Sequence, residues 1–106
     1  MDEAIGRVLD ALARAGDRAD SLGAAGEAVR YLTHAAELTD EPLERAALLD
    51  RAGWLAVHVP DYDAAAQLLG ESIALYEAQG DQRSAARVSG RLAAVFEYDG
   101  CDLVLE

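Results

Sequence analysis

The sequence predicts an all-α protein of about five antiparallel helices, and three observations carry this prediction. Alanine is the commonest residue and proline occurs only at Pro42 and Pro60, so the composition favours helix over strand. No stretch alternates apolar and polar residues in the manner of a strand. Between short turn-forming segments, apolar residues instead recur at spacings of three and four, as they do on one face of a helix.

Turn-forming residues divide the chain into five helical segments. The predicted helices run from Asp2 to Leu22, Ala24 to Leu38, Pro42 to His58, Tyr62 to Ala78 and Gln82 to Tyr98. Because only a few residues connect them, successive helices are expected to be antiparallel neighbours. A chain of 106 residues suits a single domain, which we place at 1–106.

The predicted helix ends carry their own signals. Three helices begin after a side chain that can cap them: Thr39 or Asp40 for the third, Asp61 for the fourth and Asp81 for the fifth. Pro42 falls in the first turn of the third helix, where proline is tolerated. Gly80 and Gly100 suit the left-handed residue that closes a helix, so the fifth helix is expected to end before Gly100.

Three of the predicted helices have a continuous apolar stripe. The stripes consist of Ala46, Leu49, Ala52, Gly53 and Ala56 in the third helix, Ala65, Leu69, Ile73 and Tyr76 in the fourth, and Val88, Leu92, Val95 and Phe96 in the fifth. Each stripe requires a neighbouring helix. The small residues of the third helix, with Gly53 among them, allow that neighbour to approach closely.

A common register links the helices into repeats. The small pair Ala15-Gly16 recurs as Ala52-Gly53 and again as Leu92-Ala93, at intervals of 37 and 40 residues. A turn residue follows each pair at the same distance, namely Gly23, Pro60 and Gly100. The next helix then repeats its own pattern, with Ala28, Leu32 and Ala35 matched by Ala65, Leu69 and Ser72.

The stretch AGWLAVHVPDYDAAAQLLGESIALYEAQGD resembles the tetratricopeptide repeat: a small pair, a turn, an aromatic-acid dipeptide and a second helix. LARAGDRADSLGAAGEAVRYLTHAAEL is a looser copy, and ARVSGRLAAVFEYDG is similar to a first helix alone. The repeats cover roughly 9–41, 46–80 and part of a third at 86–106. This resemblance implies helical hairpins stacked as a right-handed superhelix. The lengthened repeats resemble those of bacterial transcriptional regulators and signalling ATPases.

The resemblance also implies a concave groove, lined by the first helix of each repeat, that holds a peptide or a partner protein. The candidate binding residues are Arg14, Arg51, Trp54, His58, Arg87 and Arg91. Arginine and tryptophan are enriched among binding hot spots. Because guanidinium groups bind carboxylates in bidentate fashion, the expected ligand is an acidic segment.

These side chains have a plainer interpretation as well. Arginines on a solvated helix face commonly pair with acids on the same helix, as Arg14 could with Asp10. By the same interpretation, Arg87 and Arg91 lie one turn apart and repel each other. Trp54 can equally pack in the core between repeats, with only its indole nitrogen accessible.

The C-terminal end presents apolar residues without a partner helix, because the sixth helix would begin only after Gly100. The residues of this end are Leu92, Val95, Phe96, Leu103, Val104 and Leu105. A contiguous exposed apolar patch usually marks an interface. We therefore expect either a piece of a longer regulatory protein or a homodimer formed through this end.

Charge and composition exclude several other functions. The formal net charge of −11 disfavours nucleic acid and anionic membranes as partners, and no run is long and apolar enough for a membrane span. The single cysteine, Cys101, indicates a reducing, cytoplasmic setting. His34 and His58 lack a nucleophile or further metal ligands at a suitable spacing, and no glycine-rich phosphate loop occurs. We expect no enzyme activity, no metal and no cofactor.

Overall fold

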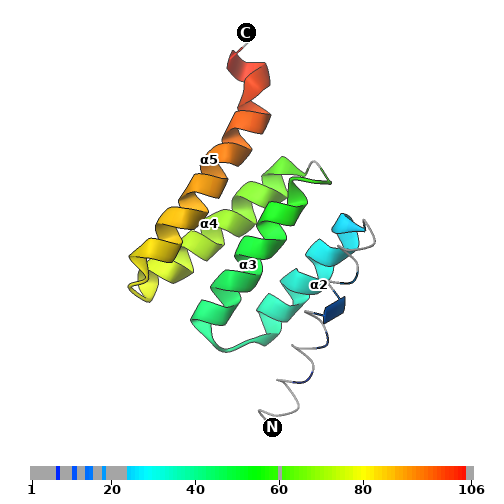
Figure 1. Cartoon of the computed structure of the whole chain (residues 1–106), viewed down its shortest axis with the longest axis vertical. Helices are drawn as coiled ribbons and strands as arrows, with labels where there is room; N and C mark the ends of the chain where they lie inside the picture. The colour runs from blue at the N-terminus through cyan, green and yellow to red at the C-terminus, as the bar shows by residue number, and fades with distance from the viewer. Residues whose placement is uncertain are drawn as a thin grey trace.

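The computed structural model describes residues 24–59 and 61–104 together with Arg7, Ala11, Arg14, Ala15 and Arg18; side chains in the last helix are described through Glu97. The helices are α2 (Ala25–Leu38), α3 (Pro42–Ala56), α4 (Tyr62–Ala78) and α5 (Gln82–Val104). Each helix runs antiparallel to the one before it and packs against it (Figure 1). The described residues contain no strand, which confirms the all-α prediction.

The helix boundaries agree closely with the predicted ones up to Ala78. The predicted segment Tyr62 to Ala78 is α4 without change, and α2 begins only one residue later than expected. Helix α3 ends at Ala56 instead of His58, because Val57, His58 and Val59 form a tighter turn whose N–H groups reach three residues back. Of the first predicted helix, the five residues described before residue 24 are helical. The rest of Asp2 to Leu22 lies outside the described residues.

Helix α5 is longer than predicted. We expected it to end before Gly100, but its backbone stays helical to Val104, and in Figure 1 this end projects past α4. Among the described residues only Gly80 has a positive φ, so Gly100 does not adopt the left-handed conformation that would close the helix. A glycine inside a helix costs only about 1 kcal/mol, which neighbouring turns can offset. The expected start of a sixth helix after Gly100 is therefore wrong.

The turns before α4 and α5 follow the predicted capping chemistry. The Asp61 carboxylate accepts the N–H of Ala64 at 3.1 Å, and the Asp81 carboxylate accepts the N–H of Ser84 at the same distance. Gly80 precedes Asp81 with φ 78°, as a closing glycine should. The hydrogen bonds from Ser84 lower the pKa of Asp81. This cap therefore stabilises the fold above the ordinary aspartate pKa of about 4 and is lost as the pH falls through the lowered value.

The turn between α2 and α3 is built differently from the prediction. Neither Thr39 nor Asp40 caps α3; the N-cap position is Glu41, without a side-chain hydrogen bond to the helix. The Thr39 hydroxyl instead accepts the N–H of Glu41 at 3.2 Å, which closes a local turn. Arg45 reaches back from α3 and donates to the carbonyl oxygens of Ala36 at 3.0 Å and Thr39 at 2.6 Å. It thereby satisfies carbonyl groups that the end of α2 leaves without partners.

The core follows the predicted stripes. The five stripe residues of α3 are all buried, and Ala65, Leu69 and Tyr76 of α4 and Val88 of α5 are buried with them. Burying a leucine such as Leu69 completely contributes roughly 1.5–3 kcal/mol. Within the fifth-helix stripe the outcome is divided, because Val95 is buried whereas Phe96 is exposed. Helix α5 packs mainly against α4, and Phe96 lies on a side of α5 that this contact does not cover.

The predicted register is visible in the burial of α2 and α4. Ala28, Leu32 and Ala35 are fully buried in α2, and their counterparts Ala65, Leu69 and Ser72 are fully buried in α4. The Ser72 hydroxyl donates to the carbonyl oxygen of Ala46 at 2.7 Å, which joins α4 to α3 inside the core. The positions matched in the sequence are thus buried in both helices.

Gly53 lies where α3 and α4 approach most closely, which confirms its predicted place at a helix crossing. A Cβ atom at this position would lie 2.8 Å from Cγ of Leu69 and 3.1 Å from the backbone nitrogen of Leu69. Real Cβ atoms essentially never show the first distance, and the second is tighter than nine in ten real Cβ contacts. Only glycine therefore permits this spacing between the two helices. The corresponding Gly16 lies outside the described residues.

Candidate functional site

A buried carboxylate is the centre of the candidate site. Asp50 stands in the middle of α3, and only 7% of its side chain is accessible to solvent. An unpaired carboxylate at such a position would be costly, so a buried aspartate needs a cation or several hydrogen bonds. Its partners come from α5, which is not a sequence neighbour of α3.

Two arginines of α5 bind the two oxygens of this carboxylate. Nη1 of Arg87 donates to Oδ2 of Asp50 at 2.9 Å, and Nη1 of Arg91 donates to Oδ1 at 3.1 Å. The interpretation that Arg87 and Arg91 simply repel each other is therefore wrong, because one acid holds both. Two guanidinium groups against one carboxylate leave a net positive charge on this part of the surface.

Trp54 completes this group of side chains. The guanidinium carbon of Arg91 lies 5.4 Å from the centre of the Trp54 ring, within the range of a cation–π interaction. Because Trp54 lies one turn after Asp50 on α3, the carboxylate and the indole ring hold Arg91 from two sides. Trp54 itself is half-buried, so it is neither a core residue nor a free surface side chain.

Asp50 also affects the pKa of Arg87. The pKa of Arg87 is raised, mainly by the hydrogen bond to Asp50, against a lowering by burial, and the charge of Asp50 and the nearby Tyr76 add smaller increases. Tyr76 is a buried residue of α4. Arg87 therefore links α5 to α3 through Asp50 and lies near Tyr76 of α4.

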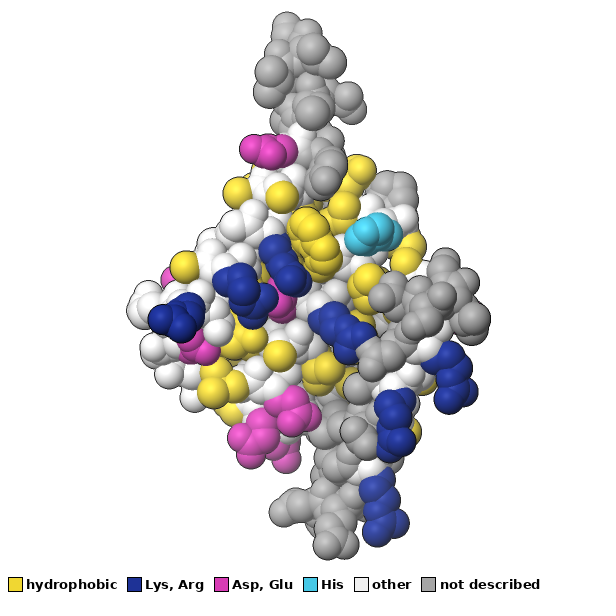
Figure 2. Space-filling view, in the orientation of Figure 1, with side chains coloured by type: hydrophobic (Ala, Val, Ile, Leu, Met, Phe, Trp, Pro, Cys, Tyr) yellow, Lys and Arg dark blue, Asp and Glu magenta, His cyan; other side chains and the backbone are white. Residues whose placement is uncertain are grey.

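The guanidinium groups remain accessible to solvent. The exposed fraction of the side chain is 49% for Arg87 and 35% for Arg91, and arginine side chains gather over this face in Figure 2. A guanidinium has five N–H donors, and each bond to Asp50 involves one nitrogen. The arginine cluster, by which we mean Asp50, Trp54, Arg87 and Arg91, can thus donate further hydrogen bonds to an anionic group from outside.

The other predicted binding residues lie around the cluster or apart from it. Arg51 is exposed on α3 beside Asp50, and His58 is exposed in the turn just after that helix. Arg14 is also exposed, and it lines a separate shallow hollow together with Ala11, Ala15 and Arg18. The structure therefore joins Arg87 and Arg91 through Asp50 and places Trp54 against Arg91, with Arg51 next to Asp50 in sequence.

The predicted self-association residues also divide into exposed and buried ones. Phe96 is 58% exposed and Leu92 is half-buried, so both are accessible on α5. Val95 is only 1% exposed and belongs to the core, so including it in an exposed surface was wrong. It turns toward α4, which the spacing of apolar residues alone could not reveal. The side chains of Leu103, Val104 and Leu105 lie outside the described part.

Two residues of α3 that bind other helices were not among the predicted ones. Asp50 interrupts the apolar run of α3, and a lone acid at such a position is a usable signal that a cation must face it. Arg45 has no comparable signal, because its carbonyl partners are recognised only when the turn between α2 and α3 is known.

The remaining findings concern metals, membranes and relatives. Among residues 24–59 and 61–104 and the five earlier described ones, no group of three His, Cys, Asp or Glu side chains could hold a metal ion. No helix in this same part of the chain has the length and apolar character needed to cross a membrane. No family model, curated protein or solved structure matches the chain.

Proposed function

We propose that this chain is a TPR-like protein-interaction module that binds an acidic segment of a partner protein through its arginine cluster. The observation that carries the proposal is the arrangement of Arg87 and Arg91, which are fixed on Asp50 and Trp54 while their outer N–H groups stay accessible. Preorganised guanidinium groups lose little side-chain entropy when they bind a carboxylate. The parent protein is proposed to be regulatory and cytoplasmic.

The burial pattern supports this proposal, because matching residues of α2 and α4 have matching burial. In the proposed repeats, α3 and α5 are the first helices of successive units. In a stack of such repeats, the first helices would line one wall of a concave groove. The side chains of the arginine cluster all come from α3 and α5.

The distribution of charge supports an acidic ligand. The whole chain has a formal net charge of −11, whereas the cluster combines two arginines with a single aspartate. A positive site within an acidic molecule discriminates by repulsion as well as attraction, because the surroundings repel an acidic segment placed anywhere else.

The proposal is tested with labelled acidic peptides of graded aspartate spacing and neutral peptides of the same length. Binding is followed by fluorescence anisotropy and by the emission of Trp54, the only tryptophan. We expect acidic peptides alone to bind and to change the Trp54 emission. Arg51→Glu places a negative charge next to Asp50, beside the arginine cluster, and is expected to weaken the binding of acidic peptides about tenfold by repulsion.

The matched control is Arg30→Glu, which makes the same charge change at an exposed position of α2. It should retain the affinity of the unmodified chain. If both variants bind acidic peptides equally well, or if neutral peptides bind as tightly, the arginine cluster is not the binding site. Circular dichroism of each variant verifies that the helices are intact.

Self-association is the second candidate function, and the exposure of Phe96 favours it. A large aromatic side chain that is 58% exposed lies next to half-buried Leu92 on the uncovered side of α5. A second copy could cover these residues as another helix would in a longer stack. In that case the arginine cluster would serve only to join α3 to α5.

Phe96→Asp separates the two candidates. If the chain forms a dimer through α5, this change should shift it to monomer, because a charge would be placed in an apolar contact. Light scattering at several protein concentrations measures the change. Ala86→Asp, at an exposed position of the same helix, is the control and should leave the mass unaltered. A chain that is monomeric at every concentration without any substitution would rule out the dimer.

A further inference from the structure

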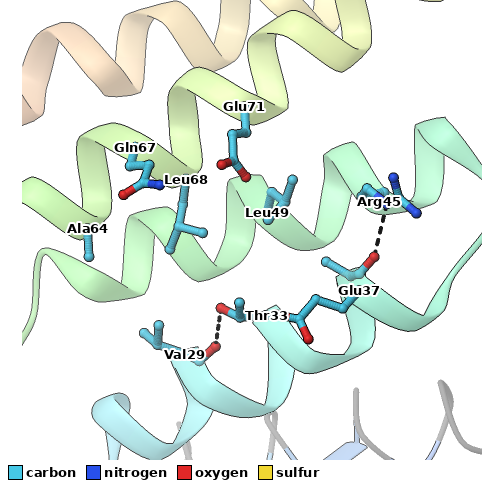
Figure 3. Close-up of a pocket in the computed structure, with 10 residues that line it drawn as sticks. Val29, Thr33, Glu37, Arg45, Leu49, Ala64, Gln67, Leu68 and Glu71 are labelled. Carbon is cyan, nitrogen blue, oxygen red and sulfur yellow. Dashed lines mark hydrogen bonds between the residues drawn. The ribbon is translucent and has the colours of Figure 1, made fainter.

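A second surface lies on the side of α3 opposite the arginine cluster. Arg45 and Trp54 are nine residues apart in α3, which is about two and a half turns, so they face opposite directions. On the Arg45 side, α2, α3 and α4 enclose an open trough of about 600 Å³ (Figure 3). Its lining comprises Val29, Thr33, Ala36, Glu37, Arg45, Leu49, Ala64, Gln67, Leu68 and Glu71.

The trough is mainly apolar because its inner polar groups are already bonded within the chain. Val29, Leu49 and Leu68 contribute aliphatic surface. The Thr33 hydroxyl donates to the carbonyl oxygen of Val29 at 2.7 Å, and the Arg45 guanidinium is bonded to carbonyl oxygens at the end of α2. A ligand would therefore meet hydrocarbon at the base of the trough.

Two acidic side chains of the described lining remain without partners for a ligand, whereas the one cation, Arg45, already donates from Nε and Nη2 at the end of α2. Glu37 lines the trough from α2 and Glu71 lines it from α4, and in Figure 3 the Glu71 side chain extends toward Leu49. Both are exposed, and within the described part of the chain neither takes part in a hydrogen bond or ion pair. Two unpaired carboxylates beside an aliphatic base complement a ligand that has an apolar stripe and flanking cations.

The dimensions fit one short helix. The trough runs along α2 from Val29 to Glu37, a length of about 12 Å at 1.5 Å per residue, or roughly two helical turns. An amphipathic helix binds such a groove with aliphatic residues at spacings of three and four. Long basic side chains beside this stripe can reach out to the acids at the edge while their stems lie on the apolar surface.

We infer that the trough between α2 and α4 binds a short basic amphipathic helix of a partner protein, with aliphatic residues on Leu49 and Leu68 and Lys or Arg beside Glu37 and Glu71. This surface is separate from the arginine cluster and selects the opposite charge. One molecule of the chain could then hold an acidic segment on one face and a basic helix on the other.

The test is a selection from a random library of short peptides on the unmodified chain. We expect enriched peptides to combine Lys or Arg with Leu, Ile or Val at helical spacing. Glu37→Lys/Glu71→Lys should weaken these peptides about tenfold or more. The matched control is Glu27→Lys/Glu77→Lys, which alters exposed acids on the same two helices outside the trough and changes the net charge equally. It should leave their affinity unchanged.

The inference is overturned if the enriched peptides show no basic bias, if no peptide loses affinity for Glu37→Lys/Glu71→Lys, or if the control pair weakens binding as much. Arg51→Glu separates this result from the proposed function. Peptides whose affinity falls in the Arg51→Glu variant bind at the arginine cluster, whereas peptides that bind in the trough should have the same affinity for this variant as for the unmodified chain. Either binding proposal can therefore be refuted without refuting the other.

Discussion

Gly53→Ala is expected to lower the free energy of unfolding by about 1–3 kcal/mol, the usual cost of overfilling a close-packed contact. The added methyl group would lie 2.8 Å from Cγ and 2.9 Å from Cδ2 of Leu69. Leu69 is fully buried and cannot turn away into solvent. Its backbone nitrogen, at 3.1 Å, could move only if α3 and α4 separated. Urea denaturation followed by circular dichroism measures the loss.

Two other helical glycines provide matched controls. Gly70 in α4 and Gly90 in α5 have no atom within 4 Å of the position that a Cβ would take. Gly70→Ala and Gly90→Ala should each raise the stability by up to about 1 kcal/mol, because alanine has the higher helix propensity. The same substitution is thus expected to have opposite signs at different sites. A stabilising Gly53→Ala would contradict the close crossing of α3 and α4.

The place of Gly53 could be predicted because it depends on local sequence. A small residue within an apolar stripe marks where helices cross, and this holds whatever the partner helix is. The starts of α4 and α5 were predictable for the same reason, since Asp61 and Asp81 each bond a backbone N–H three residues ahead. Such signals act within a single turn of helix and are legible in the sequence.

The end of α5 was missed because its signal is ambiguous. A glycine such as Gly80 closes a helix when the chain must turn, whereas Gly100 remains inside one. The difference depends on the structure that surrounds each glycine and not on the residue type. For Val95 and Phe96 the limit is similar: both fit an apolar stripe, but only the position of α4 decides that Val95 is buried and Phe96 exposed.

The candidate site was predicted in part. The predicted helices contain Trp54, Arg87 and Arg91 where the structure has α3 and α5, yet Asp50 was not connected with them. Asp50 lies 37 residues before Arg87 and 41 before Arg91, so no helical spacing links them. Spacing rules describe neighbours within one helix, whereas this ion pair depends on how α5 is laid against α4 and thereby brought to α3.

The ion pairs of Asp50 predict that Asp50→Asn lowers the free energy of unfolding of the unmodified chain but raises it in a variant that lacks Arg87 and Arg91. Removing both cations with Arg87→Gln/Arg91→Gln should cost about 2–3 kcal/mol, because it leaves the Asp50 carboxylate without its partners in a buried position. Asp50→Asn alone should cost only about 1 kcal/mol, since the two arginines are partly exposed and water can replace the lost bonds.

The combination of all three substitutions is the decisive variant. In the absence of both arginines, Asp50→Asn removes an uncompensated charge, so the triple variant should be more stable than the double variant by about 1 kcal/mol. Arg30→Gln/Arg83→Gln, at two exposed positions, is the control for the loss of two positive charges and should stay within about 0.5 kcal/mol of the unmodified chain.

Urea denaturation of the full set measures each difference, with the slope of the transition showing whether the unfolded state has changed. If Asp50→Asn destabilises the double variant as much as the unmodified chain, Asp50 does not depend on Arg87 and Arg91. The arginines would then be held by other contacts. If the sign reverses, Asp50 is the residue that fixes both guanidinium groups in place, which is the geometry on which the proposed recognition of an acidic partner relies.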